Sequence, residues 1–238
     1  MRVAAVIAAA GKGKRLKAKV PKSFLPVFGK PILAWTLLNL ARAFGFEEII
    51  VTAGKADLGR MRDLAKRQGL RRVRVVVGGK TRALSVKNGV ASVSPSCDWV
   101  LVHDAARPLV SARLVKEILK AAKKSGAAIC ALRATATIKK TDIRGKAVLG
   151  TEDRRRIFLA QTPQVFKKEL LLQRYAALGR KIGSLTDEAS FFDGTHVAVQ
   201  VVPGETRNIK ITTPEDLDLF KYYFKKYKKA SSSRGNDV

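Results

Sequence analysis

Cysteine and histidine are scarce in this sequence, which limits the kinds of site it can form. Among 238 residues there are two cysteines, Cys97 and Cys130, and two histidines, and no CxxC pair occurs. A disulfide framework, or a zinc site built on clustered Cys and His, is therefore not expected. The same scarcity favours a reducing, cytoplasmic setting.

Long hydrophobic runs are missing as well. A membrane-spanning helix needs about 20 apolar residues, and no stretch approaches that length. The first apolar run, residues 3–10, follows a single arginine and is similar to the core of a signal peptide. It is short, however, a basic glycine-containing segment follows it, and its Val and Ile residues favour a buried strand. We interpret it as the first strand of the fold.

Acidic residues are heavily outnumbered by basic ones. The chain has 19 Asp and Glu against 47 Lys and Arg, a formal net charge of +28, which suggests nucleic-acid binding as one function class. The last 18 residues contribute only +5, so the excess is spread over the whole chain. Aromatic residues make up 7%, and no basic stripe is interleaved with side chains on which a single strand would stack. The charge therefore leaves a nucleic-acid binder and an enzyme with an anionic substrate as alternatives.

Short β-branched runs alternate with helical patterns along most of the chain. The predicted strands are Val3–Ala9, Glu48–Thr52, Val73–Val77, Trp99–Val102, Ala127–Leu132, Arg156–Ala160 and His196–Val202, and the predicted helices are Ile32–Phe44, Leu58–Gln68, Arg82–Val93 and Arg113–Lys124. This alternation predicts an α/β fold: a Rossmann-like, mainly parallel twisted sheet with helices on both faces, in one domain over residues 1–229. In such a sheet, ligands bind at the carboxyl ends of the strands.

Two segments depart from this alternation. Residues 135–155 are polar, with a turn-like stretch at Asp142–Lys146, and predict a protruding hairpin arm. The final helix is predicted to begin at Pro214, with Thr213 as its N-cap, and a flexible tail is expected over residues 230–238.

The segment after the first predicted strand combines glycines with cations. It is not a dinucleotide fingerprint, because Leu16 stands where a third glycine belongs, and no G-K-[ST] closes it as in a P-loop. Gly11 and Gly13 allow main-chain N–H groups to surround an anion, and Arg15 and Lys22 can neutralise phosphate oxygens. The alternative is a solvated run of charge, but a position directly after a strand favours an anion site.

A second candidate anion site follows the third predicted strand. Gly78 and Gly79 precede a predicted helix on which Arg82 and Ser85 lie three residues apart, on one face. A helix N-terminus with an arginine and a hydroxyl binds anions. The alternative for Ser85 is an ordinary helical residue without a ligand.

A carboxylate and a cation follow the fourth predicted strand. Asp104 comes directly after a buried run, and Arg107 is three residues further on. In so basic a chain, a carboxylate at a strand end suggests a ligand for Mg²⁺, which prefers oxygen ligands and substrate phosphates. The alternative for Asp104 is a cap for the next helix. His103 is expected to be a packed neighbour rather than a catalyst.

Seven motifs, taken in order, carry a resemblance to a known family. They are AAAGKGKRL, PKSFLPV, GGKTRALSV, VHDAARP, QTPQVF, TDEAS and NIKITTPEDL. From Val3 to about Tyr223 the chain resembles the 2-C-methyl-D-erythritol 4-phosphate cytidylyltransferases, of the nucleotidyltransferase A superfamily. The resemblance implies transfer of CMP from CTP to the 4-phosphate of methylerythritol phosphate, with release of pyrophosphate, in the non-mevalonate isoprenoid pathway. Positioning and charge neutralisation suffice for such chemistry, so no side-chain nucleophile is needed.

The resemblance also implies roles for individual residues. The catalytic pair would be Arg15 and Lys22. CTP would be held by Ala9, Ala10, Gly11, Gly79 and Ser85, to which the residue patterns add Gly13 and Arg82. Methylerythritol phosphate would contact Asp104, Arg107, Thr137, Arg154 and Lys210, with Asp104 also holding Mg²⁺. Thr137 and Arg154 would lie on the arm and complete the site of a partner subunit in a homodimer.

The chain departs from the family pattern at a position near the cytosine, and one related enzyme is a close rival to this assignment. Lys80 stands where an acidic residue can meet the cytosine, so base selection would rest on the backbone around Ala10 and Gly79. The rival is ribitol-5-phosphate cytidylyltransferase, with the same chemistry on another polyol phosphate. Ser85 and the HDAARP and TDEAS motifs resemble the methylerythritol enzyme more closely.

Overall fold

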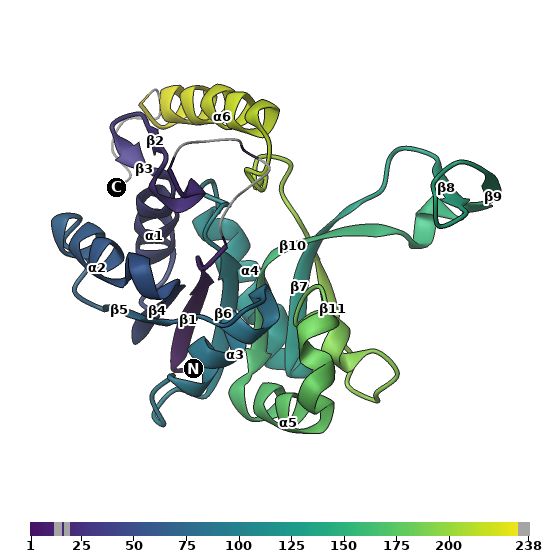
Figure 1. The fold of residues 1–238 in the computed structure, drawn as a ribbon, viewed down its shortest axis with the longest axis horizontal. Coiled ribbons are helices and arrows are strands. Elements are labelled where there is room, and N and C mark those ends of the chain that lie inside the picture. The colour runs from purple at the N-terminus through teal and green to yellow at the C-terminus, as the bar shows by residue number, and fades with distance from the viewer. Residues whose placement is uncertain (12–15, 17–19, 233–238) are drawn as a thin grey trace.

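A seven-stranded sheet forms the centre of the computed structural model, which describes residues 1–11, 16 and 20–232, without the side chains of residues 180 and 228–232 (Figure 1). Its strands are β1 (Val3–Ala8), β4 (Glu48–Ala53), β5 (Val73–Val77), β6 (Trp99–Asp104), β7 (Ala127–Arg133), β10 (Phe158–Lys167) and β11 (Gln200–Pro203). Their spatial order is β11-β7-β10-β6-β1-β4-β5. All neighbouring pairs are parallel except those of β10, which runs antiparallel to β6 and β7. The predicted, mainly parallel α/β sheet is confirmed.

The first apolar run forms β1, an interior strand that lies between β6 and β4. Val6 of β1 lies opposite Ile50 of β4 on one side and Val102 of β6 on the other. Val and Ile fit such a position because their branched side chains pack well on a pleated surface that is buried on both faces. The interpretation of this run as a strand is confirmed.

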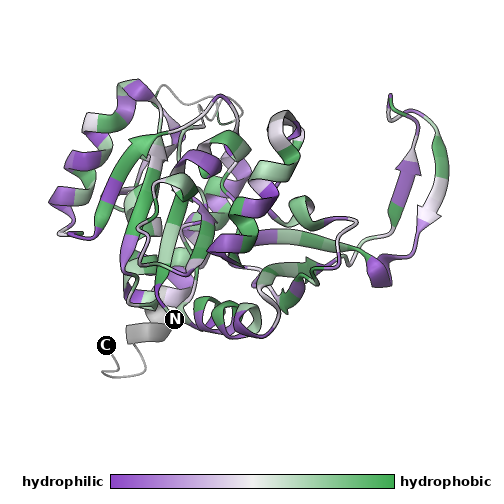
Figure 2. Ribbon diagram, turned by 90° about the horizontal axis from the view of Figure 1, so that it is seen from below, coloured by the Kyte–Doolittle hydropathy of each residue, from purple (hydrophilic) through white to green (hydrophobic). Residues whose placement is uncertain are grey.

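Helices cover both faces of the sheet. The helices of the structure are α1 (Ile32–Ala43), α2 (Leu58–Arg67), α3 (Arg82–Ala91), α4 (Ala112–Ser125), α5 (Lys168–Leu178) and α6 (Pro214–Ser232), and the 3-10 turns are η2 (Lys22–Phe24), η3 (Lys55–Asp57), η4 (Arg154–Arg156), η5 (Gly179–Ser184) and η6 (Ala189–Phe192). Successive residues of a strand face opposite sides, so Ala5 and Ile7 pack with α1, α2 and α4, whereas Ala4 and Val6 pack with α3 and α5. In Figure 2 the central strands are accordingly mostly hydrophobic, and the helices carry hydrophilic stretches as well.

The region after the arm differs from the sequence-based expectation. A strand was predicted over Arg156–Ala160, but β10 continues to Lys167 and runs antiparallel. The sequence pattern did not predict this extension, because Pro163 lies within it and proline is unusual inside a central strand. The register with β7 also shifts between Gln161 and Gln164. The predicted strand at His196–Val202 is confined to β11, and α5 was not predicted.

The polar segment forms a separate two-stranded arm, as predicted. Strands β8 (Ile138–Thr141) and β9 (Val148–Glu152) pair antiparallel, and Figure 1 shows them projecting far from the rest of the molecule. The turn is closed by Asp142, whose Oδ1 accepts hydrogen bonds from the backbone N–H groups of Lys146 and Ala147 at 2.7 and 2.9 Å. The arm carries exposed apolar side chains at Ile143, Val148 and Leu149.

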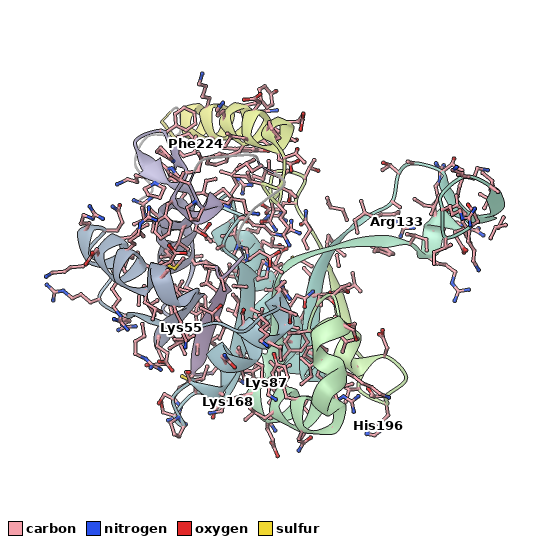
Figure 3. The ribbon with its side chains drawn as sticks, in the orientation of Figure 1. Lys55, Lys87, Arg133, Lys168, His196 and Phe224 are labelled. Carbon is pink, nitrogen blue, oxygen red and sulfur yellow. The ribbon has the colours of Figure 1, made fainter. Side chains whose placement is uncertain are left out.

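Helix α6 packs against the small hairpin of β2 (Pro26–Val27) and β3 (Lys30–Pro31). Its start is as predicted: Asp216 Oδ2 accepts hydrogen bonds from the backbone N–H groups of Thr212 and Thr213. Phe224, labelled in Figure 3, stacks on Phe28 with ring centroids 4.6 Å apart. Within the part of the chain that the structure describes, no helix has both the length and the apolar character needed to cross a membrane.

Candidate active site

A cavity of about 670 Å³ opens at the carboxyl ends of the strands. The strand register explains its position, because Ala8 at the end of β1 lies opposite Thr52 of β4 and Asp104 of β6. The lining comes from the segments that follow β1, β4, β5 and β6, from η2, and from residues 210 and 212 before α6. The segments predicted to carry the site, which are far apart in the sequence, therefore meet at one edge of the sheet.

One wall of the cavity is main chain brought close by glycines. A Cβ atom added to Gly78 would lie 2.7 Å from Ala10 Cβ and 2.9 Å from Ser85 Oγ, and one added to Gly79 would lie 2.5 Å from Leu84 Cβ. Only glycine allows these segments to approach so closely. Ser85 Oγ joins the same wall, since it accepts a hydrogen bond from Gly79 N at 3.0 Å and donates to Thr81 O at 2.8 Å. The wall brings together Ala9, Ala10, Gly11, Gly79 and Ser85.

Three cations surround the carboxylate of Asp104. Its Oδ1 accepts a hydrogen bond from Arg82 Nε at 2.9 Å, and its Oδ2 lies 2.8 Å from Lys210 Nζ and 3.6 Å from Arg107 Nε. Burial by itself would raise the pKa of Asp104, but these three neighbours hold the pKa well below its ordinary value. Asp104 is therefore ionised, and it does not cap α4, because Ser111 does so by accepting a hydrogen bond from Leu114 N.

Arg82 joins two carboxylates. Its Nη1 donates to both oxygens of Glu188 at 3.1 and 3.0 Å, while its Nε contacts Asp104. Burial lowers the pKa of Arg82, and the two carboxylates outweigh that effect and raise it. Glu188 is fully buried, and its burial raises its pKa to about 7 despite the contact with Arg82. Glu188 belongs to the TDEAS motif, but sequence reasoning gave it no role.

Arg107 and His103 are buried neighbours of Asp104 in the sequence, and neither is among the described residues that line the cavity. Arg107 is buried, and its Nη1 donates to the backbone oxygen of Asn208 at 2.7 Å. The ring of His103 is fully buried between the backbone oxygen of Arg107 and the hydroxyl of Thr162, at 3.0 and 3.1 Å. Burial lowers the pKa of His103 to about 4, so its imidazole is neutral at physiological pH. This agrees with the expectation of a packed neighbour.

Two lysines line the cavity from opposite ends of the chain. Lys22 begins η2, is half-buried, and donates from Nζ to the backbone oxygen of Ile211 at 2.8 Å. Lys210, one residue before Ile211, contacts Asp104. The segment between β11 and α6 thus brings both ammonium groups to the same cavity.

Of the four remaining predicted residues, Thr137 and Arg154 are described, and both lie on the arm. Gly13 and Arg15 lie outside the described residues. Thr137 and Arg154 are exposed on the arm, where Arg154 Nη1 donates to the backbone oxygen of Thr135 at 2.8 Å, and the described lining of the cavity includes neither.

The described residues contain no group of three or more His, Cys, Asp and Glu side chains arranged to hold a metal ion. Among the described residues that line the cavity, Asp104 is the one carboxylate. This donor set suits Mg²⁺ held mainly by substrate phosphates with a single protein carboxylate, and it does not suit a cation held by protein side chains alone.

Comparison with known proteins shows which family this chain belongs to. The family model described as 2-C-methyl-D-erythritol 4-phosphate cytidylyltransferase matches residues 3–226. The chain belongs to this family. It is 37% identical over 227 residues to the 2-C-methyl-D-erythritol 4-phosphate cytidylyltransferase of Syntrophus aciditrophicus. The alignment covers 94% of this chain and 97% of the relative.

Solved structures of the family have the same fold. The 4-diphosphocytidyl-2C-methyl-D-erythritol synthase of Anaerococcus prevotii is similar with a TM-score of 0.83 and 32% identity, over 94% of this chain and 96% of that one. The cytidylyltransferase of Thermus thermophilus has a TM-score of 0.75 and 32% identity, over 94% and 98%. The chain is thus a cytidylyltransferase of the methylerythritol phosphate pathway, and the enzyme class predicted from its motifs is confirmed.

Proposed function

We propose that cytidylyl transfer takes place in the cavity at the carboxyl ends of β1, β5 and β6. An oxygen of the 4-phosphate of 2-C-methyl-D-erythritol 4-phosphate attacks the α-phosphorus of CTP. A P–O bond forms there, the bond to the bridging oxygen breaks, and pyrophosphate leaves with the electron pair. The other product is 4-(cytidine 5′-diphospho)-2-C-methyl-D-erythritol. The observation that carries this proposal is the meeting of lysines 22 and 210 with Asp104 in one cavity beside a glycine wall.

CTP would lie along the glycine wall. The close approach of Gly78 to Ala10 leaves main chain exposed to the cavity, where N–H and C=O groups can recognise the edge of a base. Gly11 and Ser85 would border the phosphates and ribose. Lys80 lines the same cavity and offers no carboxylate to the cytosine, which supports base selection by the backbone at Ala10 and Gly79.

The cations would neutralise the charge that develops during transfer. Lys22 faces the cavity, and Arg15 is assigned beside it from the family pattern; both would stabilise the pentacoordinate phosphorus. Lys210 would position the attacking phosphate. The substrate contact of Arg107 implied by the family pattern stays a prediction, because this side chain is only 10% exposed.

Asp104 would hold Mg²⁺ together with phosphate oxygens of CTP, which fits its position as the one carboxylate among the cavity residues that the structure describes. When bound, the ion would withdraw charge from the triphosphate. For this role Asp104 has to be ionised and to keep its orientation. The cations around it favour the ionised form and hold the carboxylate in place.

The arm would complete the site of a second subunit. It buries little of its own apolar surface, since Ile143 is fully exposed and Val148 and Leu149 are about two-thirds exposed. Exposed apolar side chains on a projecting hairpin suit a partner surface, and a symmetric dimer would cover two such arms. Arg154 and Thr137 would then reach the cavity of the neighbour.

A mixing experiment tests the shared site. Lys22→Ala and Arg154→Ala should each be inactive as pure dimers, whereas heterodimers contain one site with both residues intact. With random pairing, half of the dimers are mixed and half of their sites are complete, so activity should return to about a quarter of wild type. If activity does not return although exchange of subunits is demonstrated, Arg154 acts within its own chain. An active pure Arg154→Ala dimer would show that Arg154 has no part in the reaction.

The activity is tested by pyrophosphate release from CTP with methylerythritol phosphate and with ribitol 5-phosphate in parallel. Release with the first substrate only is expected, and preference for the second would reassign the polyol. A salt series addresses nucleic-acid binding, whose non-specific affinity collapses as salt rises, whereas pyrophosphate release should persist at moderate salt. A cytoplasmic location, inferred from the scarcity of cysteine, remains part of the proposal.

A further inference from the structure

Glu188 is a buried carboxylate that the proposed chemistry does not use. It is 106 residues from Arg82 in the sequence, does not line the cavity, and has no exposed surface. We propose that Glu188 is a positioning residue: it holds the guanidinium of Arg82 against Asp104 and so fixes the orientation of the Asp104 carboxylate toward the substrates. This rests on the proposed function, because the groups that Asp104 would face are those of cytidylyl transfer.

The contacts of Arg82 fix its guanidinium from two directions. Nη1 is bonded to both oxygens of Glu188 and Nε to Oδ1 of Asp104, all within 3.1 Å. A planar guanidinium held by two carboxylates can neither rotate nor move without breaking charge-assisted hydrogen bonds. Arg82 thus transmits the position of Glu188 to Asp104.

Glu188 itself is anchored to the sheet. Its neighbour Asp187 accepts a hydrogen bond from Gln164 Nε2 of β10 at 2.7 Å and another from the backbone N–H of Ser190 at 3.1 Å. Phe191, which follows in η6, is buried in the core beneath α3 and α5. The carboxylate of Glu188 is therefore a fixed point, in contrast to a carboxylate on an exposed loop.

The two oxygens of Asp104 are consequently held in different ways. Oδ1 is bonded to Arg82, which Glu188 restrains, whereas Oδ2 is bonded to Lys210, whose side chain is 39% exposed. A flexible, partly exposed lysine can exchange one anion for another, and a clamped arginine cannot. Lys210 can thus turn to a substrate phosphate and give up its contact with Oδ2, which still lies 3.6 Å from Arg107 Nε, while Arg82 keeps the carboxylate in its orientation.

Glu188→Gln is the direct test, because glutamine keeps the shape and removes the charge. The assay is run at pH 8, where the carboxylate is ionised in the wild type. The kcat should fall about tenfold or more, the effect typical of a lost charge-assisted hydrogen bond, while the KM for CTP stays within about twofold. Wild-type kcat in the variant would overturn the proposal. Lack of activity in the wild-type enzyme would instead refute the proposed function.

A double-mutant cycle separates positioning from general structural damage. In an Arg82→Ala background, Glu188→Gln should lower kcat no further, because Glu188 acts through Arg82. Independent, multiplicative losses would overturn the proposal.

The matched control is Tyr175→Phe. Tyr175 is buried beside Phe191 in the same cluster, and its hydroxyl has no hydrogen-bond partner among the described residues. This variant should keep wild-type kcat, and an equal loss of kcat would show that any polar change in the cluster has the effect attributed to Glu188.

If Glu188→Gln does not fold, Arg82→Lys tests the same link. A lysine ammonium cannot reproduce the fork that contacts both carboxylates, so kcat should fall with the KM for CTP retained. Unchanged kcat would refute the positioning role. A rise in KM for CTP without a loss of kcat would show that Arg82 binds CTP directly.

Discussion

Gly78→Ala places a methyl group in the wall of the cavity, where its effect follows from the geometry. The new Cβ would lie 2.7 Å from Ala10 Cβ, which is 0.7 Å short of an ordinary contact of 3.4 Å. Ser85, on the other side, is held by its hydrogen bonds to residues 79 and 81, so Ala10 is the neighbour that has to move. Ala10 lines the cavity, and its displacement changes the space proposed for CTP.

Two magnitudes follow for Gly78→Ala. Overpacking of this kind lowers the free energy of unfolding by about 1–3 kcal/mol. If about 1.4 kcal/mol of that strain must also be overcome when CTP binds, the KM for CTP rises about tenfold. Urea unfolding measures the first quantity, and pyrophosphate release at varied CTP concentration measures the second.

Gly89→Ala is the matched control, since it adds the same methyl group within α3, at a position that does not line the cavity. Its Cβ would lie 2.5 Å from Val6 Cγ1 and 2.9 Å from Thr52 Cγ2, a clash as severe as that at Gly78, but within the core. We expect a similar loss of stability with an unchanged KM for CTP. If both variants raise the KM equally, the effect comes from general destabilisation. If Gly78→Ala leaves the KM unchanged, CTP does not lie against this wall.

Three further predictions concern charge. Lys22→Ala should retain the fold, by circular dichroism, and lower kcat about a hundredfold or more, the usual cost of one electrostatic contact in the transition state; near-wild-type turnover would remove Lys22 from catalysis. Asp104→Asn should lower activity and shift its Mg²⁺ titration to higher concentration, and an unchanged titration would exclude Asp104 as a ligand. Burial raises the pKa of Glu188 from 4.5 to about 7, so the folded state holds its proton more tightly than the unfolded state. This adds to the free energy of unfolding below pH 4.5, and the addition is lost as the pH rises through 7. Urea unfolding of Glu188→Gln should therefore show a smaller decline over that interval, and an equal decline would contradict the shift.

Much of the site was predictable from sequence because its signals are local. A strand followed by glycines and cations, as at Ala10 and Gly11, or by a carboxylate, as at Asp104, can be recognised within a few residues, and parallel strands bring their carboxyl ends to one edge. The same local logic predicted the arm and its turn at Asp142. Motif order then pointed to the family that the comparisons confirmed.

Contacts across the fold could not be predicted in this way. Periodicity reports which face of an element is buried, but not which element covers it, so the antiparallel course of β10 through Pro163 became evident only from the sheet. In the same way, the sequence alone predicted that Arg82 binds an anionic ligand at a helix N-terminus. Tertiary packing decides that its guanidinium meets Glu188, because a fully buried carboxylate requires a cation and folding brings Arg82 to it from 106 residues away.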